Sequence, residues 1–135
     1  MKYLTDEEFI AELENCRLPN ESFRHRDHLR LAWIYLRRHG KIGAPSRIAQ
    51  SIRRYATHHG KPERYHETIT QAWLVLMSDA CAGAAEGSTF ECVLAAFPPL
   101  LEKDLLAKFY SRELLQSDAA RASFVAPDLA PLPVT

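Results

Sequence analysis

The sequence lacks the features that define several large classes of protein. Its three cysteines, Cys16, Cys81 and Cys92, are widely spaced and form no C-x-x-C pair, which excludes a disulfide-stapled mini-protein. Its five glycines are scattered and form no phosphate-binding loop. No apolar run approaches the ~20 residues that cross a bilayer, and the N-terminus has no secretory signal pattern. These absences indicate a cytoplasmic protein without a membrane anchor, whose thiols are free and buried.

The chain also lacks net charge, because 17 Lys and Arg residues balance 17 Asp and Glu residues. This balance excludes a strongly basic protein that coats nucleic acid. The charge is nevertheless uneven: residues 24–64 hold eleven basic and two acidic residues, a net charge of +9 that the rest of the chain offsets. The basic segment is either a set of solvated helical faces or a surface that binds an anion. Nucleic acid is the less favoured partner, because the acidic flanks would repel it.

What the sequence does contain is a succession of helix signals, with no convincing strand. With 135 residues and 47% hydrophobic residues, it is long enough for one domain with a real core. Capping boxes, prolines and glycines mark where helices begin and end. The four main helices are expected from Thr5 to Pro19, from about Ser22 to His39, from Pro45 to Gly60, and from Pro62 to about Cys81.

Shorter helices are expected in the C-terminal third of the chain. Ser88 with Glu91 forms a capping box, and Ser111 and Ser117 are expected to cap two further helices. Residues 127–135 are rich in proline and are predicted to form an extended tail packed on the other helices. The predicted fold is all-α: one domain over residues 1–135, an up-down bundle of four main helices with short C-terminal helices.

The placement of the six histidines is the most informative feature for function. On a helical wheel, His25 and His28 lie on the apolar face of the second expected helix. His66 lies on the apolar face of the fourth, with Thr70 one turn further along and Glu67 beside it. Short loops favour antiparallel neighbours, so the first turns of these two helices are expected at one end of the bundle. The end of the third helix, with its Tyr55, His58 and His59, is expected to arrive at the same end.

This convergence has three interpretations. The first is a metal site in which His25, His28 and His66 bind Zn, Fe, Mn, Ni or Cu, and Glu67 is a fourth ligand or general base. The second is a metal-free pocket for a small anionic or aromatic ligand, with a histidine as the acid-base group. Its candidate binding residues are Tyr55, Tyr65, Thr70, Trp73, Arg54 and Arg64. The third is a set of structural histidines in the core. His66 and Glu67 are the candidate catalytic residues of the first two.

Two segments of the chain also resemble a group of small uncharacterised bacterial helical proteins. The residues that carry the resemblance are Phe23, His25, His28, Leu29, Ala32 and Trp33, in the pattern F-x-H-x-x-H-L-x-x-A-W, followed by Tyr65-His66-Glu67-Thr68 as Y-H-E-T. The resemblance implies a bacterial cytoplasmic helical protein and adds no reaction.

Taken together, the sequence favours a site for a divalent metal or small anionic ligand, and names no reaction or substrate. The alternative is a non-catalytic interaction or oligomerisation module with structural histidines. In that case Leu31 and Ile34, on the far side of the second helix, would form the seam of a homodimer.

Overall fold

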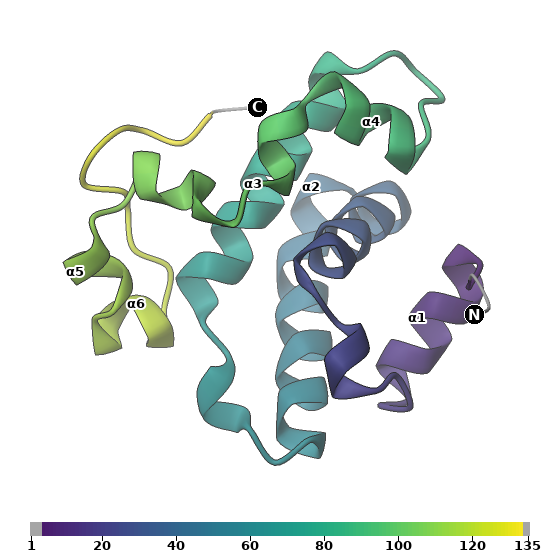
Figure 1. Cartoon of the computed structure of the whole chain (residues 1–135), viewed down its shortest axis with the longest axis horizontal. Helices are drawn as coiled ribbons and strands as arrows, with labels where there is room; N and C mark the ends of the chain where they lie inside the picture. Colours follow the sequence, from purple (N-terminus) through teal and green to yellow (C-terminus); the bar gives the residue numbers. More distant parts are fainter. Residues whose placement is uncertain (1–3, 134–135) are drawn as a thin grey trace. The chain divides into compact units, whose positions relative to one another are not determined.

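The structure is a computed structural model that describes residues 4–133, which fold into helices joined by irregular segments (Figure 1). No β-strand occurs among these residues, so the predicted all-α class is confirmed. The α-helices are α1 (Asp6–Glu14), α2 (His25–His58), α3 (Glu67–Gly83), α4 (Phe90–Ala96), α5 (Arg112–Leu115) and α6 (Asp118–Ala122). The 3-10 helices are η1 (Asn20–Ser22), η2 (Pro62–Arg64), η3 (Pro98–Leu101) and η4 (Lys103–Lys108).

The chain divides into two compact units, residues 1–65 and residues 66–135. The first unit holds α1, η1, α2 and η2, and the second holds α3 to α6 with η3 and η4. None of the helices in the described part of the chain is long and apolar enough to cross a membrane. The single domain over residues 1–135 and the up-down bundle of four helices stay predictions.

The longest helix, α2, is two helical segments joined at Gly40. Gly40 has φ 72° and ψ 178°, a combination that only glycine adopts readily, and helical geometry resumes at the next residue. The chain therefore changes direction sharply between residues 25–39 and residues 41–58 (Figure 1). The predicted stop at Gly40 is confirmed. The predicted start at Pro45 is wrong, because Gly40 sets the boundary and Pro45 lies inside the second segment.

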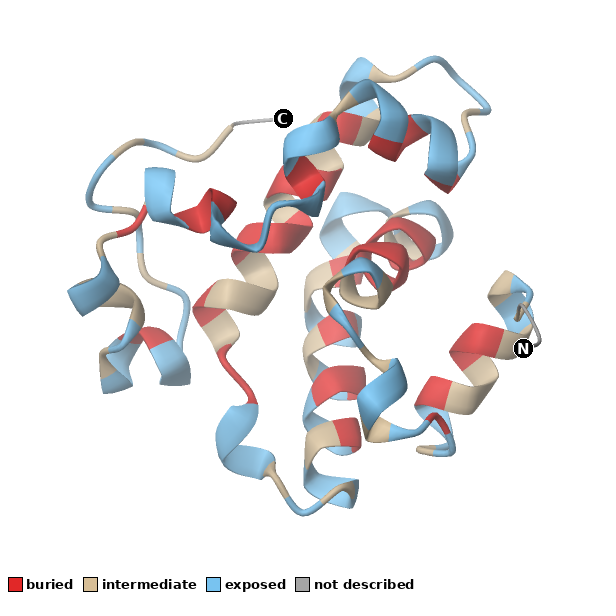
Figure 2. Ribbon diagram, in the orientation of Figure 1, coloured by how far each residue is buried: buried red, intermediate tan, exposed pale blue. Residues whose placement is uncertain are grey.

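Buried polar contacts attach α1 to α2. The Arg30 side chain is only 6% exposed and donates to Asp6 Oδ1 at 2.9 Å and to the Leu4 carbonyl at 2.7 Å. The Tyr35 hydroxyl bonds both Glu14, at 2.5 Å, and the buried Ser51, at 2.6 Å. These contacts satisfy polar groups at the junction of the two helices. Residues 29–35 are all buried, so the first segment of α2 is buried on every side, whereas the buried residues of the second segment are spaced along one face (Figure 2).

The second unit is organised around α3, which packs against α6. Thr68, in the first turn of α3, is fully buried, and its hydroxyl donates to the Ser123 carbonyl at 2.9 Å. The same hydroxyl accepts from the Val125 N–H at 3.1 Å. Thr68 therefore ties α3 to the segment that follows α6 through both hydrogen-bonding functions of one side chain.

The sequence predicts the helix caps correctly with one exception. The capping box of Thr5 and Glu8 and the caps Ser111 and Ser117 are confirmed. The predicted box at Ser88 is wrong, because Thr89 accepts from the Cys92 N–H and caps α4 instead.

The predicted start of the fourth main helix at Pro62 is also wrong. Pro62 opens the 3-10 turn η2, and the backbone at Tyr65 and His66 is extended before α3 begins at Glu67. The three cysteines are free, as expected, but the prediction that they are buried is wrong: Cys16 and Cys81 are partly exposed and Cys92 is exposed. Residues 123–133 contain no helix, and the Asp128 carboxylate accepts from the Ser111 N–H at 2.7 Å.

We expect Gly40→Ala to destabilise the protein by roughly 1–3 kcal/mol, because alanine at this φ and ψ strains the backbone. No atom lies within 4 Å of the added methyl group, so the effect isolates conformation from packing. Urea denaturation measures it. The matched control Gln50→Ala, at an exposed position of the same helix, is expected to change stability by less than about 0.5 kcal/mol. Equal stability of the two variants would contradict the kinked geometry of α2.

We expect Thr68→Val to destabilise the second unit by about 1–2 kcal/mol, because at constant side-chain size it removes both hydrogen bonds of a fully buried hydroxyl, those with the Ser123 carbonyl and the Val125 N–H. Hydrogen exchange should show faster exchange of the Val125 amide. The matched control is Thr70→Val on the same helix, since the Thr70 hydroxyl makes no hydrogen bond within residues 4–133. Unchanged protection of the Val125 amide in Thr68→Val would refute the role of this hydroxyl.

Candidate functional site

A pocket of about 210 Å³ lies within the first unit. It is formed where the start of α2, the end of α2 and the segments on either side of this helix come together. Its lining residues are Asn20, Phe23, His28, Ile52, Tyr55, Ala56, Lys61, Arg64 and Tyr65. The pocket combines aromatic walls with polar and cationic side chains, which is the composition expected of a site for a small ligand.

The kink of α2 accounts for the position of the pocket. His28 comes from the first turn of α2, whereas Ile52 and Tyr55 come from the last turns of the second segment. In a straight helix of this length these residues would lie more than 30 Å apart, at ~1.5 Å per residue. The change of direction at Gly40 allows both ends of one helix to line one pocket.

His28 supplies an uncharged imidazole to the pocket. Its ring stacks on Phe23 with 4.0 Å between the ring centroids and 25° between the planes. Burial, together with the charge of the neighbouring His25, lowers the pKa of His28 to about 4. The ring nitrogens of His28 have no hydrogen-bond partner within residues 4–133. At neutral pH His28 therefore offers one donor and one acceptor that no described residue uses.

Tyr55 contributes its ring, because its hydroxyl is already bonded. The hydroxyl donates to the Leu18 carbonyl at 2.8 Å. Burial and the Glu21 carboxylate raise the pKa of Tyr55 to about 12, so the phenol stays neutral and is not a base at physiological pH. The ring meets Phe23 edge-on at 5.1 Å between centroids, which fixes both aromatic walls.

Two cations line the pocket without a carboxylate partner. Lys61 is half-buried and Arg64 is exposed, and neither side chain makes an ion pair or hydrogen bond within the described residues 4–133. Both belong to the segment around η2, which also places Tyr65 in the pocket wall. The Arg53 guanidinium lies 4.6 Å from the centroid of the Tyr65 ring, so a third cation stands beside this wall.

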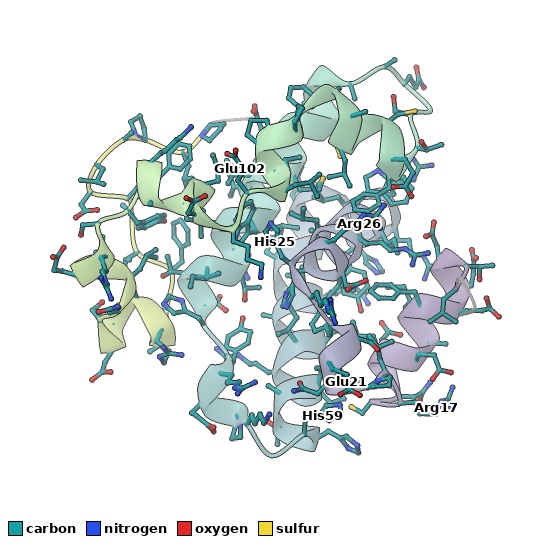
Figure 3. The ribbon with its side chains drawn as sticks, in the orientation of Figure 1. Arg17, Glu21, His25, Arg26, His59 and Glu102 are labelled. Carbon is teal, nitrogen blue, oxygen red and sulfur yellow. The ribbon has the colours of Figure 1, made fainter. Side chains whose placement is uncertain are left out.

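Carboxylates and a further histidine lie near the same end of the unit. Glu21 and His59 appear close together in Figure 3, and both lie near Tyr55. Glu21 is exposed, and the Asp27 carboxylate accepts from the Arg24 N–H at 2.9 Å. None of these side chains lines the pocket, so its charged lining is cationic.

His59 carries a second polar atom without a partner. Its ring packs on Tyr55 with 4.4 Å between centroids, and its Nε2 atom is buried. No hydrogen-bond partner for this atom is present among residues 4–133. The end of α2 thus holds an unsatisfied imidazole nitrogen directly behind the pocket wall, and the exposed His58 lies beside it.

The structure brings together part of the predicted site. The predicted residues that line the pocket are His28, Tyr55, Tyr65 and Arg64. His25 neighbours His28 without lining the pocket. Arg54 is exposed outside it and donates to the Glu14 carbonyl at 3.4 Å. The remaining predicted residues, His66, Glu67, Thr70 and Trp73, belong to the second unit.

In the second unit, His66 is the N-cap of α3. Its Nδ1 accepts from the Ile69 N–H at 3.1 Å, and its Nε2 lies 2.6 Å from the Leu115 carbonyl. Since a carbonyl only accepts, Nε2 carries the proton and both ring nitrogens are occupied. Glu67 accepts from Gln71 at 3.4 Å in the first turn of α3. This arrangement gives His66 a structural role in its own unit.

Within residues 4–133, no three His, Cys, Asp or Glu side chains are grouped as a metal ion requires. His25 and His28 lie in the first unit and His66 in the second. The metal set of these three histidines, and catalysis by His66 and Glu67, stay predictions.

Besides the aliphatic Ile52 and Ala56 of α2, three lining residues were not among the predicted site residues: Asn20, Phe23 and Lys61. They lie in the segments before and after α2 rather than within it. The helical wheel ranks positions on a helix face and gives no information about such segments. The signal that would have found them is proximity in sequence to the two ends of α2.

Comparison with protein-family models, curated proteins and solved structures found no match to this chain.

We expect His28 to make the protein less stable in mild acid. The unfolded chain binds a proton at His28 below about pH 6.5, whereas the folded protein resists doing so until about pH 4. The contribution of the neutral His28 to the free energy of unfolding is therefore fully present above pH 6.5. It falls as the pH drops through this window, by up to about 3 kcal/mol. Urea denaturation between pH 4.5 and 7.5 measures the effect.

In His28→Gln this part of the pH dependence of stability should disappear. The difference between the variant and the wild type separates the contribution of His28 from that of the carboxylates. The exposed His58→Gln is the matched control and should keep the wild-type profile. If the stability of the wild type and of His28→Gln changed with pH in the same way, the prediction would be wrong, and His28 would be hydrated in the folded protein.

Proposed function

We propose that the first unit binds a small organic anion in its pocket, with Lys61 and Arg64 holding the negative charge. The observation that carries this proposal is that both cations line the pocket and have no anionic partner within the described residues. A cation without a partner beside partly enclosed, apolar walls attracts an anion more strongly than one in open water, because the local dielectric is lower.

The geometry of the cations suits a carboxylate or phosphate group. A guanidinium such as that of Arg64 offers two parallel donors to such a group, and the Lys61 ammonium adds a compact charge. Neutral hydrogen-bonding groups stand in the same pocket, since His28 and Asn20 have side chains without partners among residues 4–133. These groups favour a ligand that carries a polar function besides its charge.

This proposal develops the metal-free interpretation of the histidine cluster. It retains His28, Tyr55, Tyr65 and Arg64 as binding residues and assigns no reaction. The metal-dependent version, with a divalent metal held by histidines, remains a separate hypothesis, as do a cytoplasmic location and a bacterial source.

The alternative of an interaction module receives no support from the expected dimer seam. Leu31 is 0% exposed and Ile34 is 3% exposed, so these two residues present no apolar surface to a partner. A sealed helix face beside an open pocket favours ligand binding as the function of this unit.

We expect the double variant Lys61→Gln/Arg64→Gln to bind small organic anions at least tenfold more weakly than the wild type. The loss follows because hydrogen bonds to charged groups contribute about 1.5–3 kcal/mol each. Isothermal titration calorimetry with benzoate, hexanoate and inorganic phosphate, at constant ionic strength, measures it.

The matched control is Lys41→Gln/Arg47→Gln, which removes two exposed cations of α2 that do not line the pocket. It changes the net charge equally and should bind like the wild type. If both double variants bound anions equally weakly, the effect would come from overall charge and not from the pocket. If the wild type bound none of these anions, the proposal would be refuted.

A further inference from the structure

The aromatic walls of the pocket narrow the class of anion. Phe23, Tyr55 and Tyr65 all line the pocket, together with the imidazole of His28. Four of its nine lining side chains are therefore planar rings, whereas only Ile52 and Ala56 are aliphatic. A wall of this kind offers π-faces and edges, which pair with another ring in stacked or edge-on geometry.

The protein holds these rings in fixed orientations without a ligand. The Tyr55 hydroxyl is anchored on the Leu18 carbonyl, and Tyr55 in turn meets Phe23 edge-on. Tyr65 is buried, and the Arg53 guanidinium packs on its ring. Rings that are already ordered lose little conformational entropy when a ligand binds, so the pocket is preorganised for a flat partner.

The volume of the pocket suits a small ligand. At about 210 Å³ it is smaller than the ~300–1,000 Å³ of pockets that hold drug-sized molecules. One six-membered ring with an acidic group fits within this volume, whereas a ligand as large as a nucleotide would extend beyond it.

We infer that the pocket takes a small aromatic acid, whose single ring packs on Phe23, Tyr55 and Tyr65 and whose acidic group binds Lys61 and Arg64. This inference rests on the proposed anion binding and specifies the body of the anion. The unpartnered side chains of His28 and Asn20 add a place for a hydroxyl group on the ring.

The test compares two acids that differ only in the nature of the ring. Benzoate and cyclohexanecarboxylate carry the same acidic group on six-membered rings, and only benzoate has a π-face. Titration calorimetry with the full chain of 135 residues should give a dissociation constant about five- to tenfold lower for benzoate. 4-Hydroxybenzoate should bind at least as tightly as benzoate, because its hydroxyl can reach a partner in the pocket.

A ring variant gives an independent readout. Phe23→Leu should lower the affinity for benzoate about fivefold and leave the affinity for cyclohexanecarboxylate within twofold, which removes the preference. Phe124→Leu, at an exposed position outside the pocket, is the matched control and should keep the preference for benzoate. Circular dichroism checks that both variants fold. If Phe23→Leu does not fold, the comparison of the two acids on the wild type still decides.

The outcomes separate this inference from the proposed function. Equal binding of the two acids, lost in Lys61→Gln/Arg64→Gln, would overturn the aromatic preference and keep anion binding. Binding of inorganic phosphate alone would have the same meaning. Binding of none of these anions would overturn both. Tighter binding of benzoate that depends on both Phe23 and Arg64 is the result that supports both.

Discussion

The left-handed conformation of Gly40 is the constraint on which the first unit depends. A residue with φ 72° and ψ 178° cannot continue a helix, so the 34 residues of α2 form two segments with different directions. The turn places the first residues of α2 beside its last turns, and the pocket occupies the place where they meet. With a side chain at this position, the same sequence would have to strain its backbone to form the pocket at all.

Polar groups in the first unit fall into two sets, and the difference between them separates structure from function. Arg30, Tyr35 and Ser51 are buried and fully occupied with partners from α1 and α2. Lys61 and Arg64 have no partners among residues 4–133, although residues 1–65 contain 8 acidic side chains beside 13 basic ones. Carboxylates were thus available in the sequence of this unit, and the fold uses them elsewhere. This pair of cations beside aromatic walls is the feature on which the proposed anion binding rests.

The sequence predicts those features that depend on local physics. Helix caps at Thr5, Ser111 and Ser117 follow from short-range hydrogen bonding, and the stop at Gly40 follows from its backbone freedom. His28 was found because it lies on a helix face that a wheel can rank, and Tyr55 because the end of its helix was expected near the same site.

The features that could not be predicted from the sequence depend on longer-range geometry or on competing local chemistry. His66 was assigned to a helix face, yet its imidazole accepts from the Ile69 N–H and replaces a cap hydroxyl, a role that periodicity does not reveal. Phe23 and Lys61 lie outside the periodic segments, so their convergence on one pocket required the path of the chain around Gly40. The caps could be predicted from pairs three residues apart, whereas the pocket joins residues separated by more than forty positions in the sequence.

Burial of His28 bears on both the metal-free and the metal-dependent hypotheses. The low pKa of His28 keeps its imidazole neutral, which is the form that either accepts a hydrogen bond or binds a metal. The choice between these uses depends on its neighbours. A metal site needs several electron-donating ligands around one point, and the nearby carboxylate of Asp27 is committed to the Arg24 N–H. The pocket instead places the cations Lys61 and Arg64 in the same lining as His28, and these repel a metal ion and attract an anion. Under the proposed anion binding, the neutral imidazole of His28 would orient the ligand through hydrogen bonding, and Lys61 and Arg64 would bind its charge.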